Sequence, residues 1–123
     1  MLEKGLKHIS AMRVEAGNTA EYIGSGDMAV LATPAMVALM ENAAMLAVAL
    51  HLGEGETTVG SMISTSHLKP SKVGNAVQAV AELTEVYGRK LTFKVEAYDG
   101  EMLIGSGEHI RFVVNREKFL SKL

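Results

Sequence analysis

The longest apolar stretch of the chain covers residues 33–51, and Glu41 is its one ionisable carboxylate. Apolar side chains around most of its circumference predict a helix that is buried on most sides. Thr33 suits the N-cap of this helix, Pro34 suits its first position, and Gly53 suits its end. We therefore expect one long helix that carries a carboxylate in its middle.

Most of the remaining chain consists of short segments with the loose alternation of β-strands. Residues 15–27 contain several glycines and are typical of a connecting loop, whereas Asp99-Gly100 is a strong hairpin dipeptide. A cap at Asn115 predicts a short terminal helix over residues 116–122, with Phe119 and Leu120 docking back on the body. The expected strands are Leu6–Val14, Thr58–Leu68, Asn75–Val86, Lys90–Tyr98 and Met102–Val114.

One of these strands carries the clearest prediction of the architecture. Val77, Ala79, Ala81 and Leu83 alternate with polar residues, so one face of the sheet is covered and the other is wetter. Only one long helix is available to cover it. We therefore expect an α+β fold in which a curved antiparallel sheet wraps around the helix, as a single domain over residues 1–123.

Composition excludes several classes of function. The chain has 12 Lys plus Arg against 14 Asp plus Glu, a net charge of -2 that gives no strong field toward nucleic acid or an anionic membrane. It has no cysteine, which removes disulfides, thiolate metal sites and thiol catalysis. The first residues lack the apolar core of a signal peptide, and Glu41 and His51 interrupt the one candidate membrane span. We expect a cytoplasmic protein.

Candidate chemistry converges on Thr33, Glu41, His67 and Gly60. Together they supply a hydroxyl, an acid or base, a proton carrier and an unshielded backbone N–H that could stabilise an oxyanion. An ionised carboxylate within an apolar helix is costly unless it has a use. Ester or thioester hydrolysis fits this set.

Each member also has a structural interpretation. Thr33 could be a helix cap and nothing more, and Glu41 could extend to the edge of the domain or pair with a cation of the sheet. His67 could be a structural strand residue whose hydrogen bonds are satisfied, and Gly60 could mark a bulge. Eight residues of helix rise about 12 Å, so Thr33 and Glu41 cannot touch within one regular helix. Substrate or water between them, a helix that starts after Thr33, or a second subunit would each solve this.

The motifs from residue 30 to the C-terminus closely resemble the hotdog-fold thioesterases of the fluoroacetyl-coenzyme A thioesterase type. The matching segments are Ala32 to Glu41, Gly60, Thr65-Ser66-His67, Glu82-Leu83, Gly88 to Leu91, Ala97 to Gly100, Ile104 to Gly107 and Glu117-Lys118-Phe119. The resemblance implies hydrolysis of acyl-coenzyme A (CoA) thioesters without metal or added cofactor, in a homodimer or tetramer with active sites at the subunit interface. It implies Thr33, Glu41 and His67 as the catalytic groups and Gly60 as the backbone donor.

The resemblance does not extend to the segment before residue 30, where such enzymes build part of the acyl pocket, so it implies a small acyl group but not a fluorinated one. A histidine just ahead of the helix, as in hydroxyacyl dehydratases, is absent. Lys69, Lys72, Arg89 and Lys90 are candidates to meet the phosphates of CoA, or else solvated turn residues. A non-catalytic acyl-CoA binding or sensing module, or a purely structural oligomer, is the alternative function.

Overall fold

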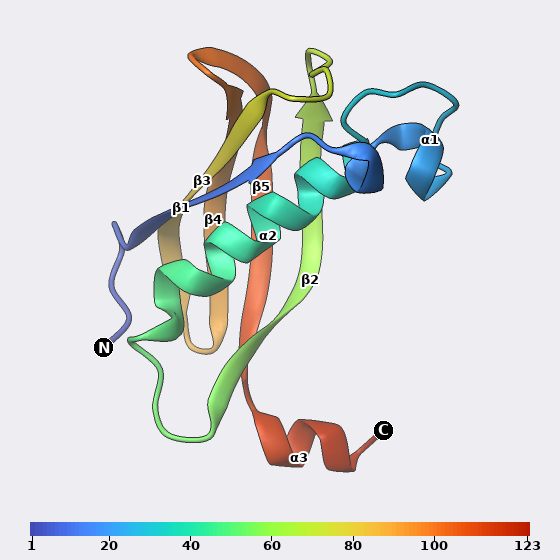
Figure 1. Cartoon of the computed structure of the whole chain (residues 1–123). Coiled ribbons are helices and arrows are strands. Elements are labelled where there is room, and N and C mark those ends of the chain that lie inside the picture. Colours follow the sequence, from blue (N-terminus) through green and yellow to red (C-terminus); the bar gives the residue numbers. More distant parts are fainter.

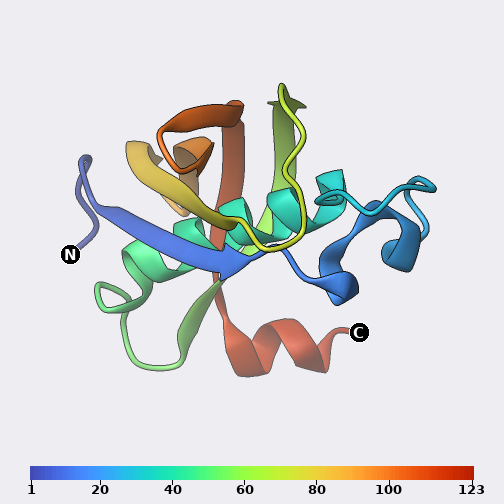
Figure 2. The ribbon, with the colours of Figure 1, turned by 45° about the horizontal axis from the view of Figure 1, so that its top comes forward.

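A single helix, α2, lies across one face of a five-stranded antiparallel sheet in the computed structural model, which describes residues 1–123 (Figure 1). The strand order is β1-β3-β4-β5-β2. Figure 2 shows the strands curving around the helix, which confirms the expected α+β architecture. The elements are β1 (Lys7–Arg13), η1 (Ala16–Asn18), α1 (Ala20–Ile23), α2 (Thr33–Ala49), β2 (Glu56–His67), β3 (Ala76–Tyr87), β4 (Lys90–Asp99), β5 (Met102–Asn115) and α3 (Arg116–Ser121).

The core lies between α2 and the concave face of the sheet. The predicted alternation of β3 is confirmed, because Val77, Ala79, Ala81 and Leu83 are all fully buried. Small alanines at the centre of β3 let the helix approach the sheet closely, and the larger side chains of β4 fill the space beside them. The helix contributes one buried face: Met36, Leu39, Met40, Ala43, Ala44, Ala47 and Val48.

Both predicted ends of the long helix are wrong in detail. Ala32 is the N-cap, with extended backbone and no side-chain cap, so Thr33 is already the first helical residue. The helix ends at Ala49, and Gly53 instead donates its N–H to Glu56 Oε1 at 2.9 Å in the following turn. The hydroxyl of Thr33 is therefore free for a contact other than capping. None of the helices is both long and apolar enough to cross a membrane.

The segment between β1 and α2 and the C-terminal helix α3 differ in part from expectation. Residues 15–27 form the short helices η1 and α1, which project from the body (Figures 1 and 2), rather than a continuous loop. The Asn115 cap of α3 is confirmed, since its side chain accepts the Lys118 N–H at 2.9 Å. The docking of α3 is wrong: it buries no residue, and Phe119 and Leu120 are 38% and 59% exposed.

Strand β2 forms one edge of the sheet and pairs only with β5. Its register shifts between Gly60 and Met62, so Ser61 is the extra residue of a β-bulge. Gly60 thus has the bulge position that was one of its two sequence interpretations. The shift changes which residues face α2: Gly60 does so before the bulge, and Ile63 and His67 do so after it.

Candidate active site

The first cluster of functional groups lies where the start of α2 meets the end of β2. Thr33 Oγ1 and His67 Nδ1 are 2.7 Å apart, a hydrogen bond that the free hydroxyl of a first-turn residue makes possible. Both residues line a pocket of about 290 Å³, together with Ala20, Ser25, Val30, Leu31, Leu68, Lys69 and Pro70. The predicted pairing of an alcohol with an imidazole is therefore present.

The imidazole of His67 is suited to carry a proton. Burial lowers its pKa, and the Lys69 backbone beside the ring opposes this shift. The ring is consequently neutral under ordinary conditions. Its Nε2 atom is buried without a hydrogen-bond partner in the chain, which is costly for a polar atom.

The second cluster surrounds Glu41, in the middle of α2. The position that a Cβ of Gly60 would occupy lies 2.8 Å from Glu41 Oε2 and 3.4 Å from Arg111 Nη1, so any side chain at Gly60 would collide with the carboxylate. The side chain of Glu41 is 39% exposed, and His109 Nε2 approaches it only to 3.9 Å. The carboxylate is thus partly desolvated, lies near a guanidinium, and is accessible for chemistry.

These two clusters do not meet within one chain. Thr33 lies in helical conformation at the start of α2, so the rise to Glu41 is that of a regular helix, about 12 Å. A helix that begins after Thr33 is therefore wrong as a solution to this separation. Within one chain, the imidazole beside Glu41 is that of His109. A second subunit that brings His67 to Glu41 is one of the solutions that the sequence left open.

His109 and Arg111 are polar residues that the sequence did not single out as functional. Both are buried, at 1% and 7% exposure. The pattern of β5 hides them, because the apolar Ile110 and Phe112 alternate with them and lie on the opposite face. His109 and Arg111 lie on the same face of β5 as the buried Val113, and this spacing was the available signal in the sequence. Polar residues that are buried beside a core residue need hydrogen-bond partners.

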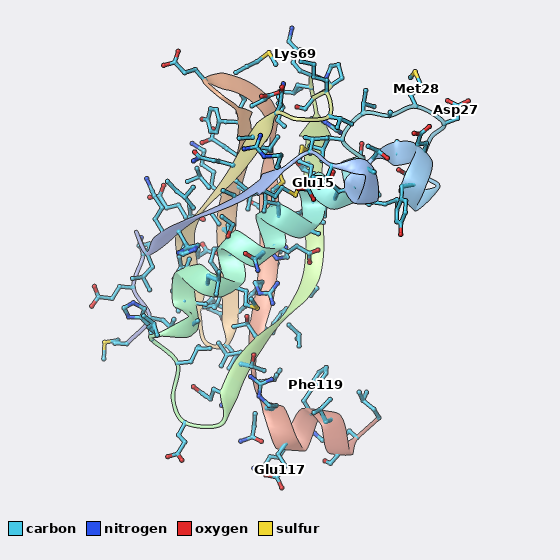
Figure 3. The ribbon with its side chains drawn as sticks, viewed as in Figure 1. Glu15, Asp27, Met28, Lys69, Glu117 and Phe119 are labelled. Atoms are coloured by element: carbon cyan, nitrogen blue, oxygen red, sulfur yellow. The ribbon has the colours of Figure 1, made fainter.

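The four candidate CoA-binding cations divide between the two ends of the molecule. Lys69 lines the Thr33–His67 pocket, and Lys72 bridges to Val30 beside it. Arg89 lines a separate cleft of about 310 Å³ with Lys118, Phe119 and Lys122, and Lys90 begins β4 next to it. In Figure 3, Lys69 and Phe119 mark these opposite ends.

Comparison with known proteins then decides the family. The profile of the FlK family, described as fluoroacetyl-CoA-specific thioesterase, matches residues 14–117. A fluoroacetyl-CoA thioesterase from Streptantibioticus cattleyicolor is 44% identical over 94 residues, which are 76% of this chain and 68% of that protein. The chain belongs to this family. Membership makes it an acyl-CoA thioesterase and decides against the sensing and purely structural alternatives.

Solved structures agree with this assignment. The fluoroacetyl-CoA thioesterase FlK superposes with a TM-score of 0.92 at 34% identity, over 99% of this chain and 95% of that one. A Thermus thermophilus thioesterase superfamily member gives a TM-score of 0.91 at 27% identity, over 99% and 90%. The fold is therefore that of the hotdog thioesterases. The family match begins before residue 30, so the similarity includes more of the N-terminal segment than the motifs indicated.

Proposed function

We propose that the chain hydrolyses a small acyl-CoA thioester with Glu41, Gly60, Thr33 and His67 as its functional groups. Glu41 removes a proton from a water molecule that attacks the thioester carbon, and the Gly60 N–H stabilises the resulting oxyanion. The carbon–sulfur bond then breaks, and CoA leaves as a thiolate that takes up a proton. Thr33 and His67 orient the acyl carbonyl and relay that proton.

A second route uses the same residues. Glu41 itself attacks the carbonyl, CoA leaves, and water then hydrolyses the mixed anhydride. Repeated turnover in heavy-oxygen water separates the two routes by mass spectrometry of the enzyme. Label in Glu41 requires the covalent route, and label confined to the product acid favours water attack.

The separation of the two clusters is the observation that carries the proposal, because it leads to a homodimer. The two clusters lie at different positions along β2, one at Gly60 and the other at His67. The outer edge of this strand is free to pair with a second copy. Met45 and Leu46 on α2 are 36% and 40% exposed. An antiparallel pair of β2 strands about a two-fold axis would cover this apolar surface and join one cluster to the other from the partner.

The bulge predicts the register of that pair. Cross-strand neighbours point to the same face of a sheet, so inward-facing Gly60 can lie beside the partner's inward-facing His67. With Ser61 looped out as the extra residue, the strands then continue so that Ser64 of one subunit faces the partner's Ser64. In this register each active site takes Glu41 and Gly60 from one subunit and Thr33 and His67 from the other.

A single cysteine tests this register, because the chain has none of its own. Directly opposed residues of antiparallel strands have Cα atoms about 4.5–5.5 Å apart, within the range of a disulfide. We expect Ser64→Cys to form a disulfide-linked dimer on mild oxidation. Ser66→Cys is the matched control on the same strand face, and it remains unlinked because its mate lies several residues away. Linkage of Ser66→Cys in place of Ser64→Cys would contradict the register.

The same pairing unites the CoA-binding candidates. The start of β2, next to Arg89 across β5, would lie beside the partner's Lys69, so the two ends in Figure 3 come together in the dimer. We propose that Lys69 with Lys72, and Arg89 and Lys90 from the other subunit, meet the phosphates of CoA, with Lys118 and Lys122 in the adjoining cleft. Lys69→Glu should raise KM for an acyl-CoA while leaving turnover of a pantetheine-only thioester unchanged.

The proposed acyl group is small, as fluoroacetyl is in the related thioesterase. The Thr33–His67 pocket of about 290 Å³ is one subunit's part of the proposed shared site. Tyr22 is the only aromatic residue of the segment before α2, and it is 72% exposed, so it does not line this pocket. A series of acyl-CoA esters of increasing chain length should show kcat/KM falling beyond the shortest members.

A further inference from the structure

His109 is a buried titratable residue that the proposed reaction does not use. It lies on β5 under α2, 1% exposed, with its ring centroid 6.2 Å from that of Phe93. Removing an imidazole from water is costly unless its polar atoms find partners. Both nitrogens of His109 have one: the Met62 carbonyl beside the bulge, and Arg111 beside Glu41.

The two hydrogen bonds determine the tautomer of the ring. Nδ1 lies 2.7 Å from the Met62 carbonyl oxygen, which can only accept, so Nδ1 carries the proton. Nε2 lies 3.2 Å from Arg111 Nη1, which can only donate, so Nε2 is the acceptor. Burial lowers the pKa of His109, and the Arg111 charge adds to this, while the Met62 carbonyl and Glu41 oppose it. His109 is therefore a neutral imidazole of defined orientation.

The first bond holds the backbone next to the bulge. Met62 directly follows the extra residue of β2, and the register on the other side of the bulge resumes at Gly60. A donor on the Met62 carbonyl therefore determines how the strand crosses the bulge. The direction of the Gly60 N–H depends on that path.

The second bond holds the guanidinium. Arg111 also donates to the Thr58 hydroxyl at 2.8 Å and to the Thr58 carbonyl at 3.0 Å. With His109 accepting from Nη1, the planar group is held on three sides. Nη1 then lies near Gly60 and the Glu41 carboxylate, so the position of the guanidinium affects where the carboxylate lies.

We propose that His109 is a positioning residue of the thioesterase site, which sets the Gly60 backbone through Met62 and the Arg111 charge through Nε2. This inference rests on the proposed function of Glu41 and Gly60. A neutral ring is essential to it, because a second ring proton would remove the acceptor from Arg111. The charged groups that face His109 are Arg111 from its own strand and Glu41 from α2.

Two substitutions separate the two bonds. His109→Asn keeps a donor near the position of Nδ1 and loses the acceptor for Arg111. His109→Gln reaches the position of Nε2 with its amide oxygen and loses the donor to Met62. We expect each to lower kcat by roughly 10- to 100-fold, since displacement by about 1 Å costs up to that much, with little change in KM. Phe93→Leu, which removes the neighbouring ring, is the control for general loss of packing.

A double-mutant cycle distinguishes positioning from a structural role. If His109 acts through Glu41, His109→Asn should cost far less kcat in a Glu41→Gln background than in the wild type. Equal losses in both backgrounds, or wild-type kcat in His109→Asn and His109→Gln, would overturn the inference. Full activity of Glu41→Gln itself would instead refute the proposed function, so the two failures are distinguishable.

Discussion

The start and the middle of α2 build two different kinds of site on one helix. At the start, Thr33 and His67 are joined by a short hydrogen bond at the mouth of a pocket. In the middle, Glu41 faces a glycine and a buried guanidinium with no close partner of its own. The first cluster has an alcohol and a base without an acid, and the second has an acid without a proton relay. Each cluster is chemically incomplete, and pairing of two copies through the edge strand β2 would bring the missing group.

Loss of the carboxylate should have the largest effect. Glu41→Ala removes the base or nucleophile and should lower kcat by at least about 10², the low end of a general-base contribution. Steady-state assay of CoA release with a thiol reagent measures it. An unchanged rate on a well-used substrate would remove Glu41 from the mechanism and leave the first cluster as the whole site.

A methyl group at Gly60 tests how closely the middle cluster is packed. The added Cβ would lie 2.8 Å from Glu41 Oε2, so the carboxylate must move. We expect Gly60→Ala to lower kcat by up to about 10² through this displacement. Gly17→Ala is the matched control, because nothing lies within 4 Å of its Cβ position. Similar rates for both variants would show that the fit around Glu41 is unimportant.

Removing the hydroxyl at the start of the helix should have a smaller effect. Thr33→Ala loses the bond to His67, and we expect kcat to fall about tenfold, below the range of a full general base. Stability should change by less than the roughly 1 kcal/mol of a lost N-cap, because Ala32 is the cap. Thr33→Ser restores the hydroxyl and should restore most of the rate. A large drop in melting temperature in Thr33→Ala would assign it a structural role.

The smallest expected effect is the dependence of the free energy of unfolding on pH. The pKa of both His67 and His109 is lowered by burial from the ordinary value of 6.5. The unfolded chain therefore binds protons more readily, and the free energy of unfolding should decrease as the pH falls below 6.5 towards the lowered values. Urea titrations at several pH values measure this slope. His109→Gln should make this slope shallower. A slope that stays the same when either His67 or His109 is replaced would contradict the burial of the two residues as neutral rings.

The sequence predicted the fold well because the fold depends on periodicity. The alternation of β3, the glycine-containing hairpins and the length of α2 are local patterns, and each was confirmed within a few residues. The end of α2 was misplaced because the apolar pattern continues into Leu50, which is 95% exposed. The burial of α1 and α3 could not be predicted, because it depends on which surface lies nearby and not on the helix itself.

The residues of the proposed site could be selected from the sequence, but their arrangement in space could not. Thr33, Glu41, His67 and Gly60 follow from side-chain chemistry and family motifs. Whether His67 faces α2 depends on the bulge at Ser61, which shifts the facing of β2 by one residue and leaves no clear signal in the residue pattern. His109 could not be selected because Ile110 and Phe112, which are apolar, alternate with the buried polar residues of β5.

Subunit mixing tests the central claim most directly. Glu41→Ala and His67→Ala homodimers should each be nearly inactive. If every site combines Glu41 from one subunit with Thr33 and His67 from the other, a mixed dimer contains one site with both defects and one intact site. Refolding the two variants together in equal amounts should therefore restore about a quarter of wild-type activity, because about half the dimers are mixed. Activity that stays at the level of the separate variants, in mixtures shown to contain mixed dimers, would contradict a site shared between subunits.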